Sequence, residues 1–144
     1  ANPVLNALLW EKEALAKRCG VQMAMEAEAA EWAGIPGRDL IVMAGNLLDN
    51  AIEAAKRCPA GHVCVTLYAE EHFLVMEVEN TCEEQPSPSG KNLLSTKPDA
   101  ANHGFGLSNV RDRAKKYGGT LYTQQKDGWF TAILTIAKLC LTWD

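Results

Sequence analysis

Two asparagine side chains, Asn46 and Asn50, lie one helical turn apart in a stretch of the chain, 46–55, that is otherwise dominated by apolar residues. Asparagine lowers helix propensity relative to alanine, and its carbonyl and amide groups need hydrogen-bond partners wherever they are buried. A bound ligand would supply such partners. The pair therefore indicates either a ligand-binding face that offers oxygen ligands and amide donors, or a solvated face, where Lys, Glu, Gln and Arg are the usual residues.

The helix that carries this pair is predicted over about residues 38–57. At about 100° per residue, its apolar and polar side chains fall on opposite arcs. The apolar arc consists of Leu40, Ala44, Leu47, Leu48, Ala51, Ile52 and Ala55, and the polar arc of Asn46, Asp49, Asn50 and Glu53. We expect the first arc to face a core and the second to face a ligand or solvent.

A second candidate for chemistry is the segment His103-Gly104-Phe105-Gly106-Leu107, which falls between a long loop and a predicted helix. Two glycines allow the backbone to turn tightly and approach a ligand closely, and the free N–H groups at the start of a helix favour phosphate. Such a segment is as often ordinary turn chemistry. It is not the dinucleotide-binding pattern, because it follows a loop instead of a strand.

The elements that must position these residues follow from periodicity and from glycine and proline breaks. The predicted order is a helix over 2–19, a strand over 21–28, the asparagine helix, strands over 62–69 and 72–80, a loop over 81–102, a helix over 107–117, and strands over 120–125 and 129–137. The first strand alternates Val21, Met23, Met25 and Ala27 with more polar residues, which predicts one buried face. The last two strands form a hairpin across Asp127-Gly128.

Hairpins instead of repeated strand–helix–strand units predict a mixed, mostly antiparallel five-stranded sheet with three helices packed on one face. This is a two-layer α/β (α+β) sandwich. A chain of 144 residues suits a single domain, 1–144, with its own core.

Composition narrows the classes of function. A net charge of −4, from 14 basic and 18 acidic residues, argues against a broad nucleic-acid-binding surface but leaves room for a small anionic ligand. Five cysteines without CxxC spacing indicate reduced thiols. No stretch approaches the roughly 20 apolar residues of a membrane span.

The motifs at 46–51 and 103–107, in this order and at this spacing, resemble the nucleotide-binding domain of the gyrase, heat-shock chaperone, histidine kinase and MutL (GHKL) ATPase superfamily, which has the Bergerat fold. The resemblance covers nearly the whole chain. In detail, the phrase at 103–111 is similar to that of the catalytic ATP-binding domain of accessory-gene-regulator and VirS type sensor histidine kinases. The resemblance implies ATP and Mg²⁺ as cofactors.

The resemblance also implies roles for individual residues. Asn50, with Asn46 one turn earlier, matches the asparagine whose carbonyl oxygen helps to hold Mg²⁺ against the nucleotide phosphates. In gyrase-like hydrolases the position of Asn46 carries a glutamate that activates water, whereas an amide cannot act as a general base. Transfer of the γ-phosphate is therefore expected in place of efficient hydrolysis. The residues expected to bind the phosphates are His103, Gly104, Phe105, Gly106 and Leu107, although His103 is equally compatible with a structural role.

Many members of the superfamily have an Asp-x-Gly-x-Gly motif where this chain has Asn80-Thr81-Cys82-Glu83-Glu84. Asn80 falls at the adenine-binding aspartate, and its carbonyl could still accept a hydrogen bond from the adenine amino group, although without the strength of a carboxylate. The loop over 81–102 takes the place of the ATP lid. Its lysines, Lys97 first and Lys91 second, are either phosphate-binding cations or solvated loop charges.

By the resemblance, the chain is the ATP-binding part of a sensor histidine kinase and delivers the γ-phosphate to a histidine in a dimerisation segment absent from these residues. None of His62, His72 and His103 is placed to be that acceptor, so the isolated domain is expected to bind ATP without labelling itself. The implied partners are the dimerisation and phospho-acceptor helices and a response regulator, with no nucleic acid. The domain is expected to be a monomeric, cytoplasmic, C-terminal part of a membrane-anchored homodimer.

Two alternatives share the fold. One is a stand-alone serine kinase of the anti-sigma-factor type, which binds a transcription factor. The other is an interaction module that has lost nucleotide binding, which the missing aspartate and glycines after Asn80 would favour.

Overall fold

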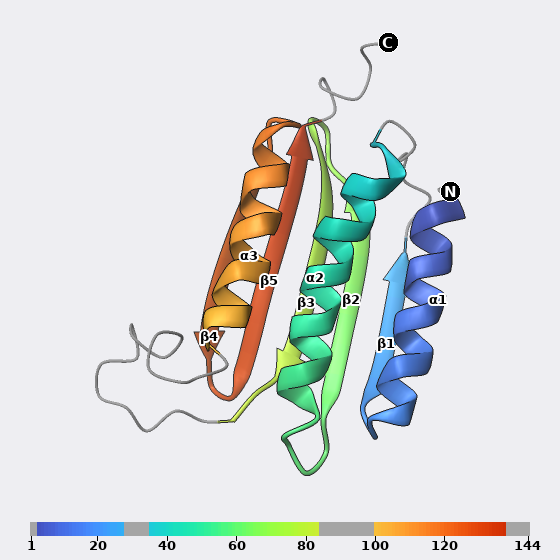
Figure 1. Cartoon of the computed structure of the whole chain (residues 1–144), viewed down its shortest axis with the longest axis vertical. Coiled ribbons are helices and arrows are strands. Elements are labelled where there is room, and N and C mark those ends of the chain that lie inside the picture. The colour runs from blue at the N-terminus through green and yellow to red at the C-terminus, as the bar shows by residue number, and fades with distance from the viewer. Residues whose placement is uncertain (1–2, 28–34, 84–99, 138–144) are drawn as a thin grey trace.

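The computed structural model describes residues 3–27, 35–83 and 100–137, except for the side chains of 100–105. The elements are α1 (Pro3–Arg18), β1 (Gln22–Ala27), α2 (Gly37–Ala55), β2 (His62–Ala69), β3 (Phe73–Thr81), α3 (Ala100–Lys115), β4 (Thr120–Lys126) and β5 (Trp129–Ala137) (Figure 1). None of the described helices is long and apolar enough to cross a membrane.

The strands form one five-stranded sheet in the order β1-β2-β3-β5-β4. β1 pairs with β2 in parallel, and the other three pairings are antiparallel, which confirms the predicted mixed sheet. The β4–β5 hairpin turns at Asp127 and Gly128, whose φ angles of 55° and 80° belong to the left-handed region that a two-residue hairpin turn favours.

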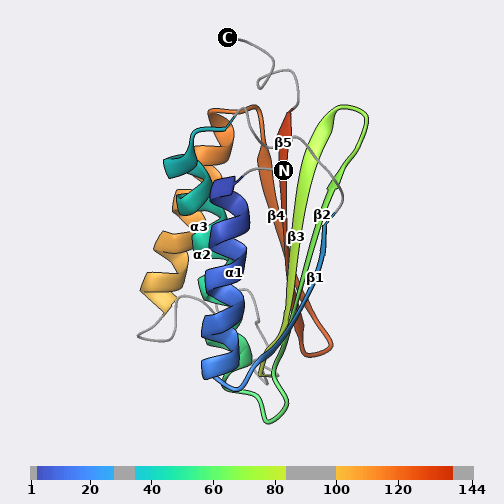
Figure 2. The ribbon, with the colours of Figure 1, turned by 90° about the vertical axis from the view of Figure 1, so that its right-hand side faces the viewer.

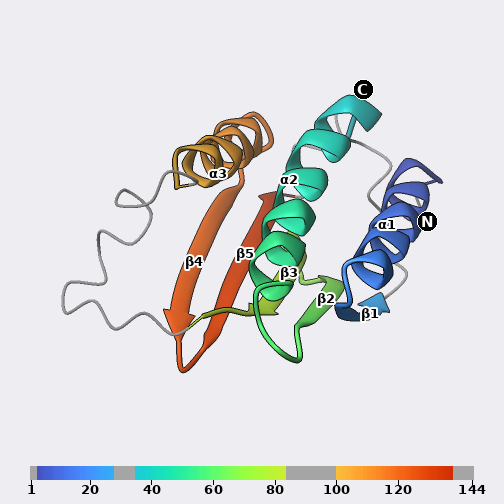
Figure 3. The same cartoon turned by 60° about the horizontal axis from the view of Figure 1, so that its bottom comes forward.

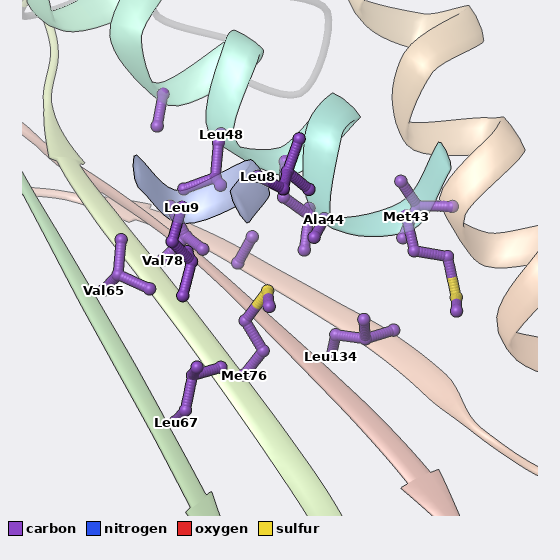
Figure 4. Packing of buried hydrophobic residues seen from close by; sticks show 14 of the residues in the cluster. Leu8, Leu9, Met43, Ala44, Leu48, Val65, Leu67, Met76, Val78 and Leu134 are labelled. Carbon is purple, nitrogen blue, oxygen red and sulfur yellow. The ribbon is translucent and has the colours of Figure 1, made fainter. Parts of the chain in front are cut away.

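The three helices lie together on one face of the sheet, as predicted (Figures 2 and 3). All seven residues of the predicted apolar arc of α2 are buried, together with alternating residues of the central strands. The sheet contributes Val63, Val65, Leu67, Leu74, Met76, Val78, Leu121, Ala132, Leu134 and Ile136 to this core, several of which are shown in Figure 4. Burial of this apolar surface is the main force that holds the helix layer to the sheet.

The predicted buried face of the first strand is wrong for most of its length. Val21, just before β1, is buried, but Met23 is only half-buried and Met25 is 39% exposed. β1 lies at the edge of the sheet, where a strand has a neighbour on one side only. Alternation in the sequence therefore identified the strand without identifying a covered face.

The boundaries of the long loop also differ from the prediction. β3 continues to Thr81, and α3 begins at Ala100, seven residues before the predicted start, so Gly104 and Gly106 lie inside the helix. Glycine is tolerated in a helix at about 1 kcal/mol relative to alanine. The two glycines are typical of a turn, but they follow the strong helix formers Ala100 and Ala101, which allow the helix to start earlier.

Candidate functional site

The predicted site residues come from elements that end at the same side of the molecule. The C-terminal ends of α2 and β3 and the N-terminal end of α3 lie together at the bottom of Figure 1. Helices α2 and α3 are antiparallel neighbours, because Asp39 near the start of α2 pairs with Arg113 near the end of α3. This arrangement brings the second half of α2 against the first half of α3.

Asn46 and Asn50 lie on the flank of α2 that faces α3. They share one ridge with Asp39 and Met43, at the spacing i, i+4, i+7, i+11, and both Asp39 and Met43 are buried. The facing ridge of α3 has the same spacing.

The facing ridge consists of Gly106, Val110 and Arg113 of α3, continued by Tyr117 in the turn that follows the helix. Residues at this spacing align along a helix, and the two ridges meet at both ends: Gly106 lies beside the asparagine pair, and Arg113 and Tyr117 donate hydrogen bonds to Asp39.

The asparagine pair and the glycine segment meet at Gly106. A methyl group placed on Gly106 would lie 3.5 Å from Asn50 Nδ2, 3.7 Å from Asn50 Oδ1 and 3.8 Å from Asn46 Oδ1. Asn50 Nδ2 is buried and has no hydrogen-bond partner among the described residues. Because buried amide groups in folded proteins are almost always paired, this donor marks a position where a ligand acceptor would be stabilised.

The other two members of the predicted polar arc have different surroundings. Asp49 forms an ion pair with Lys12 of α1, with Nζ to Oδ1 at 2.8 Å. Glu53 pairs with Lys56 at 3.3 Å and Arg57 at 3.6 Å, both just beyond the C-terminal end of α2. The polar arc is thus not one continuous face: Asn46 and Asn50 face α3, whereas Asp49 links α2 to α1.

Asn80 lies one residue before the end of β3 and is 2% exposed. It continues the row of core-facing side chains formed by Met76 and Val78. Its Nδ2 donates a hydrogen bond to the carbonyl oxygen of Thr81, at 2.9 Å. This bond orients the amide, so that Oδ1 is the atom left to accept a hydrogen bond from a ligand.

The remaining predicted residues are placed only in part. The backbone of His103, Gly104 and Phe105 is helical, and Leu107 is buried in the core below the site. Because α3 begins at Ala100, the backbone N–H of Leu107 lies beyond the first four N–H groups that a helix leaves free, so the predicted phosphate contact through that N–H is not supported. Lys91 and Lys97 lie outside the described residues.

A buried cluster that the sequence analysis missed lies at the other end of the α2–α3 interface. Asp39, which is 2% exposed, accepts a hydrogen bond from Arg113 Nη1 at 2.5 Å and another from the Tyr117 hydroxyl. Lys116 Nζ lies 3.5 Å from Asp39 Oδ2. An aspartate in the first turn of a helix is ordinarily explained by the helix dipole. Only the matching ridge spacing of the two helices could have indicated burial.

The pKa values of this cluster follow from burial and hydrogen bonding. Burial by itself raises the pKa of Asp39, but the hydrogen bonds from Tyr117 and Arg113 and the charges of Lys116 and Arg113 outweigh it, so the pKa lies below its ordinary value. Burial, with the hydrogen bond to Asp39, raises the pKa of Tyr117 to about 12. Asp39 is therefore an anion at neutral pH and Tyr117 a neutral donor.

The donor set suits a hard cation shared with a ligand. No group of three or more His, Cys, Asp or Glu side chains is gathered for metal binding within the described part of the chain. The oxygens near Gly106 are amide oxygens, which can ligate Mg²⁺ alongside phosphate and water but form no protein cage for it.

Comparison with known proteins agrees with this geometry. Residues 37–137 match the family model of the GHKL domain. The sensor histidine kinase DcuS of Escherichia coli K12 is 30% identical over 99 residues, which are 64% of this chain and 17% of DcuS. The chain therefore corresponds to a small part of that relative.

Solved structures of histidine kinases have the same fold. The catalytic domain of histidine kinase ThkA superposes with a TM-score of 0.67 at 21% identity, over 94% of this chain and 90% of that one. Full-length ShkA, solved in complex with AMPPNP, gives a TM-score of 0.68 at 18% identity over 92% of this chain and 29% of that one. The chain belongs to the GHKL family of ATP-binding domains, and its fold is that of a histidine kinase catalytic domain.

Proposed function

We propose that this domain binds Mg-ATP between α2 and α3 and delivers the γ-phosphate to a histidine in another segment of a longer sensor kinase. The observation that carries the proposal is the buried Nδ2 of Asn50 beside Gly106, which has no hydrogen-bond partner within the part of the chain that the structure describes. The family match and the similarity to DcuS and to ShkA, whose structure holds an ATP analogue, support the choice of ligand.

Different atoms at the α2–α3 contact would bind the metal ion and the phosphates of a triphosphate. Oδ1 of Asn50, with Oδ1 of Asn46, would ligate Mg²⁺, and Nδ2 of Asn50 would donate to a phosphate oxygen. Bound Mg²⁺ would neutralise charge that develops on the transferred phosphoryl group. Asn46 cannot remove a proton from water, so the site holds the γ-phosphate without a general base at that position.

The adenine and the rest of the phosphate chain are assigned to the neighbouring elements. Asn80 Oδ1 would accept a hydrogen bond from the adenine amino group, because Nδ2 already donates to Thr81. The segment His103, Gly104, Phe105, Gly106 and Leu107 would lie beside the phosphates, where the two glycines leave room for a ligand, with Lys97 and then Lys91 as candidate cations. The start of α3 adds the partial positive charge of a helix N-terminus.

The proposal extends to the longer protein. Residues 1–144 would be one domain of a kinase, and the acceptor histidine would lie on dimerisation helices elsewhere in it. A response regulator would receive the phosphate. This domain would act in the cytoplasm as a monomeric unit of a membrane-anchored dimer.

The test is calorimetric titration with an ATP analogue that is not hydrolysed, with Mg²⁺ and with EDTA. We expect binding that weakens without Mg²⁺. Asn50→Ala should weaken binding at least tenfold while leaving the free energy of unfolding unchanged or slightly higher, because it removes a buried donor that no described residue pairs and raises helix propensity.

Asp49→Ala is the matched control, because Asp49 is the preceding residue but faces Lys12 of α1. Its affinity should stay within about twofold of the original chain, since it touches no ligand. Absence of binding at millimolar nucleotide would instead support an interaction module. Equal losses of affinity in the two variants would show that Asn50 has no special role.

A further inference from the structure

Two kinds of interaction hold α3 in place. Directional hydrogen bonds act at one end, and non-directional burial of apolar side chains acts along its length. Along its length, α3 is held to the core by Leu107, Val110 and Ala114, which are all buried and apolar. Apolar burial has little directional preference, so such a stripe resists separation of the helices more than sliding along their axes. The buried Asp39 cluster, by contrast, depends on the angle and distance of each hydrogen bond.

The Asp39 cluster is not well explained as a device for stability alone. Burying a carboxylate requires its dehydration, and an ion pair recovers this only with good geometry and further hydrogen bonds. Apolar side chains of similar volume could fill the same place at equal or greater stability. What an apolar contact would not supply is a unique register between the two helices.

The register matters because the same two ridges carry the candidate nucleotide site. Asp39 and Asn50 are 11 residues apart on α2, and Gly106 and Arg113 are 7 apart on α3. At about 1.5 Å per residue, a slip of α3 by a single residue would move Gly106 by about 1.5 Å along Asn50. Such a shift is half the length of a hydrogen bond.

We propose that Asp39 is a positioning residue for nucleotide binding. By anchoring the end of α3 through Arg113 and through Tyr117 in the turn that follows, it fixes the register in which Gly106 faces Asn46 and Asn50. Asp39 itself touches no ligand. The proposal rests on nucleotide binding at the α2–α3 contact, as proposed above. Its structural part, the register of Gly106 against Asn50, can be tested without any nucleotide.

The experiment uses the 144-residue chain labelled with ¹⁵N, and follows the backbone amide of Gly106 and the side-chain amide of Asn50 by nuclear magnetic resonance. Asp39→Asn keeps the shape of the side chain but turns an N–H₂ group toward donors. Tyr117→Phe removes one hydrogen bond and keeps Arg113 in place. Both should shift the two resonances. They should weaken binding of the ATP analogue by about tenfold and threefold, respectively, because Asp39→Asn disturbs the hydrogen bonds to both Arg113 and Tyr117 whereas Tyr117→Phe removes one of them.

Leu9→Ala is the control for loss of stability without loss of register, because Leu9 is buried in the core on α1. Measured well below its unfolding transition, it should leave both resonances and the affinity unchanged. If Asp39→Asn does not fold, Tyr117→Phe provides both measurements. If the original chain binds no nucleotide, the proposed function is refuted. The Gly106 and Asn50 resonances would still show whether Asp39 sets the register of α3 on α2.

Three results would overturn the positioning role. Unchanged Gly106 and Asn50 resonances in the folded variants would show that the cluster does not set the register. Shifted resonances with unchanged affinity would show that the register is irrelevant to binding. A loss of affinity in Leu9→Ala as large as in Tyr117→Phe would show that affinity follows stability alone.

Discussion

Replacing Gly106 by alanine should raise the stability of the fold and lower its affinity for nucleotide. Within α3, Gly106→Ala removes the backbone entropy penalty of a helical glycine, which is about 0.5–1 kcal/mol. The new methyl would lie 3.5–3.8 Å from Asn50 and Asn46, an ordinary van der Waals distance that requires no movement of either side chain. We therefore expect a stability gain of up to about 1 kcal/mol, or a rise in Tm of about 3 °C.

Nucleotide binding should respond in the other direction. A ligand oxygen hydrogen-bonded to Asn50 Nδ2 would sit about 2.9 Å from it. The methyl would occupy the space in front of Nδ2, between Asn50 and Asn46, that this oxygen requires. Loss of one such contact to a charged phosphate corresponds to about 1.5–3 kcal/mol, so the Kd should rise at least tenfold.

The assay pairs thermal unfolding with calorimetric titration of the ATP analogue and Mg²⁺. Gly45→Ala is the matched control, because Gly45 is also helical and a methyl there would have nothing within 4 Å. It should gain similar stability and keep its affinity. Original affinity in Gly106→Ala would refute the assignment of the space beside Asn50 to a ligand, and a large loss of stability would refute the α2–α3 packing.

Two further predictions concern the scaffold. Asp39 has a lowered pKa in the folded chain, so its contribution to stability is present above its unfolded pKa of about 4 and is lost as the pH falls through the folded value. In urea unfolding at pH 3–7, the free energy of unfolding should fall less toward acid pH in Asp39→Asn than in the original chain. An equal fall in the two proteins would contradict the buried ion pair. Gly119→Ala should destabilise the fold by about 2 kcal/mol or more without changing the affinity of the folded protein, because its methyl would overlap the backbone carbonyl oxygen of Thr135, 2.0 Å away. Urea unfolding and titration together test it, and a variant as stable as the original chain would contradict the close approach of the two backbones.

Local sequence was sufficient to predict the elements and the fold class. The seven apolar residues of α2 are all buried, and both hairpins form where alternation and turn residues placed them. Periodicity works here because a helix or strand that packs on one core must repeat its apolar residues at its own period. Periodicity failed at β1, where burial depends on the neighbouring elements. It also failed at the start of α3, where helix formers compete with glycine.

The candidate site was predicted as two separate motifs. Sequence spacing and the family resemblance singled out Asn46, Asn50 and Gly106, but did not show that these residues are in contact. The polar arc looked continuous on a helical projection. Its division between α3 and Lys12 of α1 could not be predicted, because it depends on which helices lie on either side of α2.

What the sequence determined by itself is the set of elements and the residue types that can hold a phosphate and a cation, since these depend on local periodicity and side-chain chemistry. What only the tertiary structure decided is the register of α3 on α2. Asp39 meets Arg113 across 74 residues of chain, and the same pairing of helices brings Gly106 to Asn50. Such contacts follow from packing and from buried hydrogen bonds, which no local pattern records.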